Sequence, residues 1–80
     1  MIDMPVLAYV FINVEAGRAF KVLEAVKKIE GVKDAHTVTG IYDIIALVEA
    51  ADLKELGEKI VDRIQGTKGV ERTVTAVIIE

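Results

Sequence analysis

The residues best suited to bind a charged ligand form one short segment, Thr39-Gly40-Ile41-Tyr42-Asp43. A glycine turn exposes backbone amides, and the amides of Gly40–Tyr42 are expected to hold a carboxylate. Asp43 is expected to pair with an ammonium group, a charge-assisted contact of about 1.5–3 kcal/mol. Because a free amino acid carries both charges, the segment predicts an amino-acid site. The alternative is that Gly40 and Asp43 are turn residues, with the carboxylate accepting local backbone amides.

Two threonines near the end of the chain are further candidate ligands. Thr73 and Thr75 are two residues apart in a predicted strand and therefore share one face of it. Threonine in a strand is commonly explained by β propensity alone. Beside segment 39–43, in the same or in a neighbouring copy, their hydroxyls would add hydrogen bonds to the ligand.

Catalytic and metal chemistry find little support in the sequence. His36 is the only histidine, and no partner for nucleophilic or acid–base work is evident. There is no cysteine, and the carboxylates are not arranged with metal-ligand spacing. Glu15-Ala16-Gly17-Arg18 lacks the spacing of a phosphate-binding loop. We therefore expect neither an enzyme nor a metal or other cofactor.

Length and charge exclude further classes of function. The 80 residues have room for one small domain, and the net charge of −3 argues against direct binding to nucleic acid. Tyr9 and Phe11 are two residues apart in one strand, as in a pair of aromatic residues that stack on RNA bases, but no cluster of basic residues surrounds them. The sequence has no run of 18 apolar residues, so it predicts no membrane span. Val6–Val14 lacks the basic flank of a signal peptide. A cytoplasmic location is the expectation.

Hydrophobic periodicity predicts the element order βαββαβ. Apolar spacing predicts a helix over residues 17–30, and the Asp52/Glu55 capping box predicts the start of a second helix. Gly57, inside that helix, indicates a close backbone approach. The apolar face of the second helix is expected to hold Leu53, Leu56, Ile60 and Ile64. The predicted strands are Val6–Val14, Val32–Thr39, Asp43–Ala50 and Val70–Glu80.

The two halves of the chain echo each other just before and after each helix, as Gly31-Val32 and Gly69-Val70 illustrate. A duplicated split βαβ unit predicts an α+β, ferredoxin-like βαββαβ sandwich. Right-handed crossovers place both helices on one face of a four-stranded antiparallel sheet, with the first and third strands in the centre.

Both faces of these central strands are apolar. In the first strand, Ala8, Val10 and Ile12 face one way while Tyr9 and Phe11 face the other. Two helices cover only one face, so the other needs a partner. We expect a second copy, paired sheet to sheet as a dimeric α/β barrel. A small-molecule or lipid pocket within a monomer is the alternative.

The segment Val38–Asp43, the dipeptide Gly31-Val32 and the run Gly69–Thr75 together resemble the ligand-binding domain of Lrp/AsnC-type regulators, also called the RAM domain. The resemblance covers Val6 to Ile79, and the T-G-x-Y-D element at Thr39–Asp43 is its most specific part. It identifies residues 1–80 as a single stand-alone domain of this type.

The resemblance implies more than the residues alone do. Lrp/AsnC domains pair sheet to sheet and assemble into rings, often of four or five dimers, which would make an octamer or a decamer. Small effectors, typically amino acids, bind between dimers near the hairpin that corresponds to residues 39–43. By resemblance, Gly40 to Tyr42 would hold the ligand carboxylate, Asp43 would contact its ammonium group, Tyr42 would line the pocket, and Thr73 or Thr75 would contribute from the last strand.

One departure from the family is large. Its usual members carry an N-terminal helix-turn-helix (HTH), whereas this chain reaches its first predicted strand after Met1–Pro5. Either the chain begins at a domain boundary, or it senses its ligand and modulates transcription by co-assembly with full-length Lrp/AsnC regulators. The alternatives are an enzyme of the dimeric α+β barrel class using His36 or Tyr9, a structural oligomer without ligand, and an ACT-like domain, against which the T-G-x-Y-D element argues.

Overall fold

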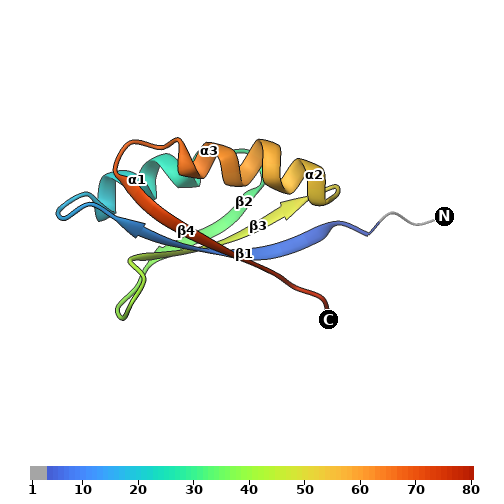
Figure 1. Cartoon of the computed structure of the whole chain (residues 1–80), viewed down its shortest axis with the longest axis horizontal. Coiled ribbons are helices and arrows are strands. Elements are labelled where there is room, and N and C mark those ends of the chain that lie inside the picture. Colours follow the sequence, from blue (N-terminus) through green and yellow to red (C-terminus); the bar gives the residue numbers. More distant parts are fainter. Residues whose placement is uncertain (1–3) are drawn as a thin grey trace.

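A computed structural model describes residues 4–80. Residues 1–3, with which the predicted domain begins, lie outside the described residues. One helical layer covers one face of a four-stranded sheet (Figure 1). The elements are β1 (Val6–Val14), α1 (Ala19–Lys27), β2 (Val32–Thr37), β3 (Ile44–Ala50), α2 (Leu53–Glu55), η1 (Leu56–Val61), α3 (Asp62–Gln65) and β4 (Val70–Val77).

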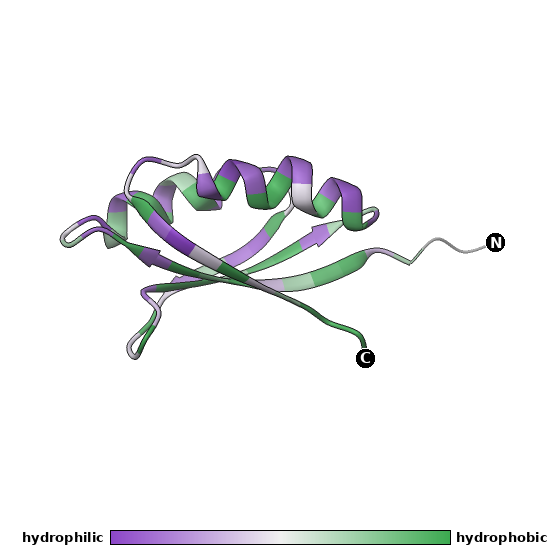
Figure 2. Cartoon of the chain, in the orientation of Figure 1, coloured by the Kyte–Doolittle hydropathy of each residue, from purple (hydrophilic) through white to green (hydrophobic). Residues whose placement is uncertain are grey.

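The sheet has the order β2-β3-β1-β4, and all neighbouring strands are antiparallel. The predicted ferredoxin-like fold, with β1 and β3 in the centre, is therefore confirmed. The strands end earlier than the sequence indicated: β2 stops at Thr37 and β4 at Val77. The hydrophobic character nevertheless continues beyond β4 to the C-terminal end of the chain (Figure 2), and the Ile78 amide still donates to the Leu7 carbonyl at 2.9 Å.

The core lies between the sheet and the helices. Alternate residues of β1 and β3 point into it, and Val10, Ile12 and Ile44 are completely buried. From the helical layer, Val22, Val26 and several residues of the second helical segment close this core. The predicted face assignment of the central strands is confirmed, because the residues between these positions lie on the other face and are only partly buried or exposed.

The second helical segment is continuous from α2 through η1 to α3, and its middle part is wound as a π-helix. The capping box is present: Glu55 N donates to Asp52 Oδ1 at 2.8 Å, and Ala51 N donates to Glu55 Oε1 at 3.0 Å. Two expectations for this segment are wrong. Leu53 is 64% exposed, because it lies in the first turn before the helix meets the sheet.

The expected close approach at Gly57 is the second error, since nothing lies within 4 Å of a Cβ built there. Close approaches occur instead where the chain enters β2 and β4. A Cβ at Gly31 would lie 2.5 Å from Ile60 Cδ1, and one at Gly69 would lie 2.9 Å from Val22 Cγ2. The repeated Gly-Val dipeptides thus mark equivalent points, where the start of a strand lies close to the helix from the other half of the chain.

Candidate functional site

The hairpin loop of residues 38–43 connects β2 to β3 and projects beyond the sheet on the side away from the helices (Figure 1). Asp43 anchors this loop with three hydrogen bonds. Its amide donates to the Ile12 carbonyl at 2.9 Å, and its carbonyl accepts from Val38 N at 2.9 Å. Its carboxylate Oδ2 accepts from Val14 N at 2.8 Å. The loop is therefore held firmly against the end of β1.

The Asp43 carboxylate takes the place of a backbone carbonyl where the β1–β3 ladder ends. Oδ2 of Asp43 thus acts as the turn residue's acceptor of a backbone N–H, which was the alternative role predicted for this side chain. The other oxygen, Oδ1, accepts no hydrogen bond from residues 4–80. Since the side chain is only half-buried, a fixed carboxylate oxygen remains accessible to a cationic group.

The backbone amides of the loop are exposed. Within the described residues, the amides of Thr39 to Tyr42 donate no hydrogen bond. Gly40 has φ +108° and open space around it. Glycine is therefore needed here for the positive φ of the backbone and not for close packing. Asn13 Nδ2 donates to the Ile41 carbonyl at 2.7 Å and steadies the loop from β1. The unpaired amides are therefore held in place and are available to an anion.

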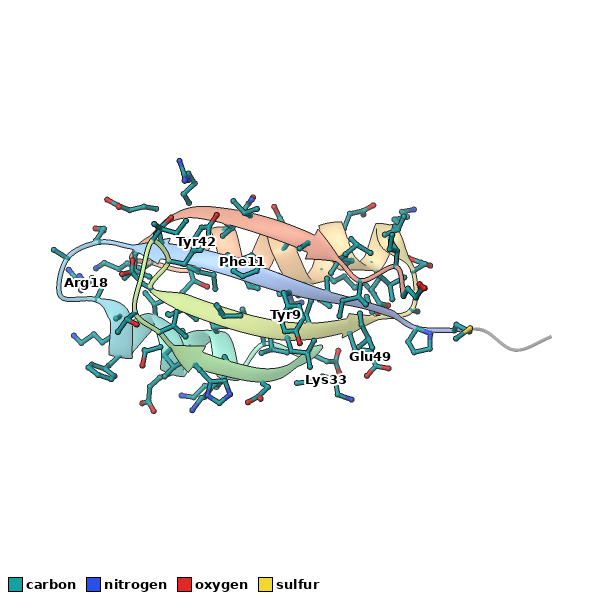
Figure 3. All side chains as sticks on the ribbon, turned by 90° about the horizontal axis from the view of Figure 1, so that it is seen from below. Tyr9, Phe11, Arg18, Lys33, Tyr42 and Glu49 are labelled. Carbon is teal, nitrogen blue, oxygen red and sulfur yellow. The ribbon has the colours of Figure 1, made fainter. Side chains whose placement is uncertain are left out.

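Tyr42 lies against the uncovered face of the sheet. Its ring centroid is 5.0 Å from that of Phe11, with an interplanar angle of 36°. Figure 3 shows the two rings at one end of this face, with Tyr9 further along β1. The loop and the uncovered face are thus in direct contact through an aromatic pair.

Thr73 and Thr75 do not meet the loop within one chain. They pair across the ladder with Ile12 and Val10, so they lie on the helix-covered side of the sheet. Thr73 Oγ1 accepts a hydrogen bond from Gln65 Nε2 of α3 at 2.9 Å. The structure therefore separates the two threonines from residues 39–43. The threonines lie on the helix-covered side of the sheet, and the loop projects from the other side.

A hollow of about 380 Å³ adjoins Asp43 at the end of β1. It is lined by Asn13, Val14, Asp43, Glu71 and Arg72. Sequence reasoning did not single out Asn13 or Arg72. Asn13 carried a signal, because it interrupts the apolar run of β1. Arg72 carried none, because its position beside Asp43 depends on the pairing of β4 with β1.

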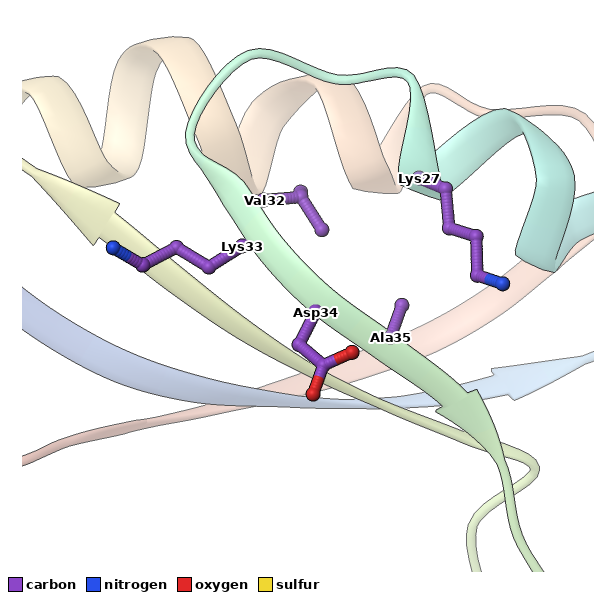
Figure 4. A pocket seen from close by; sticks show the side chains of 5 residues that line it. All are labelled: Lys27, Val32, Lys33, Asp34 and Ala35. Carbon is purple, nitrogen blue, oxygen red and sulfur yellow. The ribbon is translucent and has the colours of Figure 1, made fainter.

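Other charged hollows lie on the helical side, and one of about 350 Å³ is lined by Asp52, Lys54, Glu55, Glu58 and Lys59. A hollow between α1 and β2 is flanked by Lys27 and Lys33, but Figure 4 shows the two lysines extending in opposite directions. His36 pairs with Asp34 at 3.0 Å, and both side chains are more than half exposed. No group of three or more potential metal ligands occurs in residues 4–80.

None of the helices in residues 4–80 has the length and apolar character needed to cross a membrane.

Comparison with protein families shows which family the sequence matches. A model described as the Lrp/AsnC ligand binding domain matches residues 7–80. Among curated proteins, the uncharacterized HTH-type transcriptional regulator PF0250 of Pyrococcus furiosus is 40% identical over 57 residues. The match spans 71% of this chain but only 38% of the regulator. Homocitrate synthase of Sulfolobus acidocaldarius is 42% identical over 52 residues, which span 65% of this chain and 11% of the enzyme.

Solved structures agree in fold. TTHA0845 from Thermus thermophilus has a TM-score of 0.87 and 33% identity, and the match covers 94% of both chains. The transcriptional regulator NMB0573 of Neisseria meningitidis, solved as its L-Met complex, has a TM-score of 0.81 and 18% identity. That match covers 94% of this chain and 50% of the regulator, and it shows a shared fold.

Proposed function

The chain belongs to the Lrp/AsnC ligand-binding domain family, and from this premise we propose that it is an amino-acid-sensing module. In this proposal residues 1–80 act as one ligand-binding domain. Ligand binding changes how copies of the chain assemble, and through co-assembly it modulates full-length Lrp/AsnC regulators. The observation that carries the proposal is the loop 39–43, where unpaired amides and a fixed carboxylate lie side by side.

The loop has binding groups for both charges of a free amino acid. Within residues 4–80, the amides of Gly40, Ile41 and Tyr42 have no hydrogen-bond acceptor, and they suit the ligand carboxylate. Asp43 Oδ1 accepts no hydrogen bond from these residues and suits the ligand ammonium group, while Oδ2 keeps the carboxylate in place. The L-Met complex of the Neisseria regulator, which shares this fold, supports an amino acid as the effector class.

The separation of the loop from Thr73 and Thr75 favours a site shared between copies. The two threonines lie on the helix-covered side of β4 and the loop projects from the other side. They can contact one ligand only if the threonines of one copy meet the loop of another. We therefore propose that the complete site forms between dimers, and that Thr39 lies at its rim.

The uncovered face of the sheet supports pairing of two chains. Tyr9 is 42% exposed and Val74 is 41% exposed, and both lie on the apolar face that no helix covers. Burying apolar surface contributes about 25 cal/mol per Å², so this face favours a second apolar sheet as its partner. We propose a sheet-to-sheet dimer, the dimeric α/β barrel, and rings of four or five dimers, that is an octamer or a decamer.

A direct role in DNA binding or catalysis is not part of the proposal. The net charge is −3, and the curated relatives that are transcriptional regulators extend well beyond the region that this chain matches. His36 is exposed beside Asp34 and lies near no nucleophile that the structure describes. In the proposed role the chain is not an enzyme, needs no cofactor and acts in the cytoplasm beside transcriptional regulators.

Light scattering with and without each common amino acid tests the proposal. We expect a mass of several dimers that shifts with one amino acid, together with a raised midpoint of thermal unfolding. A ligand at 100 times its dissociation constant adds about 2.7 kcal/mol of stability. A fixed dimer that responds to no amino acid would contradict the sensing role.

Asp43→Asn is the matched variant. Its carboxamide oxygen can still accept the Val14 amide hydrogen, so the loop keeps its anchor while the negative charge is lost. We expect amino-acid affinity to fall about tenfold to a hundredfold with little change in thermal stability. Unchanged affinity in a folded Asp43→Asn variant would exclude Asp43 as the ammonium contact.

A further inference from the structure

The hollow beside Asp43 contains a positive charge that the proposed site does not yet use. Arg72, at the start of β4, lines this hollow together with Asp43 and Glu71. Its guanidinium makes no ion pair and no side-chain hydrogen bond with any residue in the described part of the chain. Arg72 and Asp43 thus flank one space of about 380 Å³ without neutralising each other.

Regular pairing with Asn13 of β1 places Arg72, and a β-bulge follows directly beside it. β1 pairs Asn13 with Arg72 but Val14 with Val70, so Glu71 is the extra residue on β4. Such a bulge bends the strand and redirects the side chains beside it. The same end of β1 supplies the Val14 amide that holds Asp43. The same end of the sheet therefore holds both the cationic and the anionic group.

We propose that Arg72 binds a carboxylate of the same ligand whose ammonium group contacts Asp43, an inference that rests on the proposed amino-acid site. A guanidinium presents two parallel N–H donors that match a carboxylate, and it stays charged at all physiological pH values. Glu71 and Asp43 give the hollow a cation-binding side, and Arg72 gives it an anion-binding side. This arrangement fits a zwitterion or an acidic amino acid better than an uncharged metabolite.

The carboxylate has two sources, the α-carboxylate common to all amino acids and the side-chain carboxylate of aspartate or glutamate. The loop amides of Gly40 to Tyr42 do not line the hollow. A ligand carboxylate therefore has two separate binding positions, one at the loop amides and one at Arg72. Arg72 is either the second contact to the α-carboxylate or the residue that recognises an acidic side chain.

The test compares Arg72→Gln with Arg63→Gln, which removes the same charge from α3 on the opposite side of the sheet. Wild type and both variants are screened against the twenty common L-amino acids by thermal shift, and each binder is titrated by calorimetry. We expect Arg72→Gln to weaken binding about tenfold to a hundredfold and Arg63→Gln to bind as wild type does. A loss for every amino acid assigns the α-carboxylate, and a loss confined to aspartate and glutamate assigns the side chain.

Binding by Arg72→Gln that equals wild type for every ligand would overturn this role. The Asp43→Asn variant separates that failure from failure of the site itself. If Asp43→Asn loses affinity while Arg72→Gln keeps it, the amino-acid site stands and the inference on Arg72 is wrong. If wild type binds none of the twenty amino acids, the proposed function and this inference are both wrong.

Discussion

The two faces of the sheet differ although the same strands build both. On the helix-covered face, Val10 and Ile12 are fully buried and the packing is complete within one chain. On the uncovered face, Tyr9 and Phe11 are apolar but remain partly or largely accessible, and the loop 38–43 meets this face through Tyr42. One face therefore stabilises the fold, while the other stays uncovered within one chain and is the surface of the proposed sheet-to-sheet dimer. Substitutions on alternate residues of one strand should separate these two roles.

The largest effect is expected on the covered face. Ile12→Ala removes a fully buried side chain from the centre of the core and should lower the free energy of unfolding by about 2–5 kcal/mol. Urea denaturation at a low and a high protein concentration measures this. Phe11→Ala, one residue away, is the control and should cost the isolated chain less. Equal losses that do not depend on protein concentration would abolish the distinction between the faces.

The next effect concerns association and not folding. Leu47 faces Tyr9 across the ladder on the uncovered side, so Leu47→Glu would place a charge inside a sheet-to-sheet interface. We expect the mass from light scattering to fall to that of one chain while the far-UV circular dichroism spectrum persists. Lys54→Gln on the exposed outer surface of α2 changes the net charge by the same amount and should leave the mass unaltered. A dimeric Leu47→Glu variant would place the interface elsewhere.

Two glycines with positive φ give a smaller and more local contrast. Gly31→Ala combines backbone strain at φ +99° with a Cβ only 2.5 Å from Ile60 Cδ1, and should cost about 2–4 kcal/mol. Gly40→Ala has φ +108° but open space around it, and should cost about 1–2 kcal/mol. Thermal and chemical denaturation measure both. A larger loss of stability for Gly40→Ala than for Gly31→Ala would mean that the contact between Gly31 and Ile60 does not require glycine at the start of β2.

The smallest effect is expected at the rim of the uncovered face. Lys33 Nζ and Glu49 Oε1 are 2.9 Å apart, but both side chains are substantially exposed (Figure 3). Lys33→Gln should therefore lower the free energy of unfolding by less than about 1 kcal/mol, and by less still in high salt. Denaturation at two ionic strengths measures this. A larger, salt-insensitive loss would indicate that the pair becomes buried when chains associate.

The sequence was sufficient to predict the fold. Short apolar runs rich in β-branched residues, an apolar pattern with helical spacing and the Asp52/Glu55 capping box are local signals, and each corresponds to an observed element. The misassigned positions have tertiary causes. Leu53 continues the helical pattern but lies before the helix meets the sheet, and close packing at glycine falls at Gly31 and not at Gly57.

The candidate site, too, has features that the local sequence predicts and features that only the tertiary structure decides. The loop 39–43 was evident from its residue types, because a glycine turn followed by an aspartate has a chemistry of its own. Strand pairing alone decides the faces of Thr73 and Thr75 and the position of Arg72. It also brings the Val14 amide to Asp43. Such pairing joins residues that lie far apart along the chain, and no local pattern specifies it.

The sequence by itself determined the elements, their order, the two apolar faces of the central strands and the chemistry of the loop, because these depend on residue type and short-range spacing. Only the tertiary structure decided which side chains share a space. It placed a carboxylate and a guanidinium around one hollow and separated the two threonines from the loop, since the register and the bulge between β1 and β4 arise from the packing of the whole sheet.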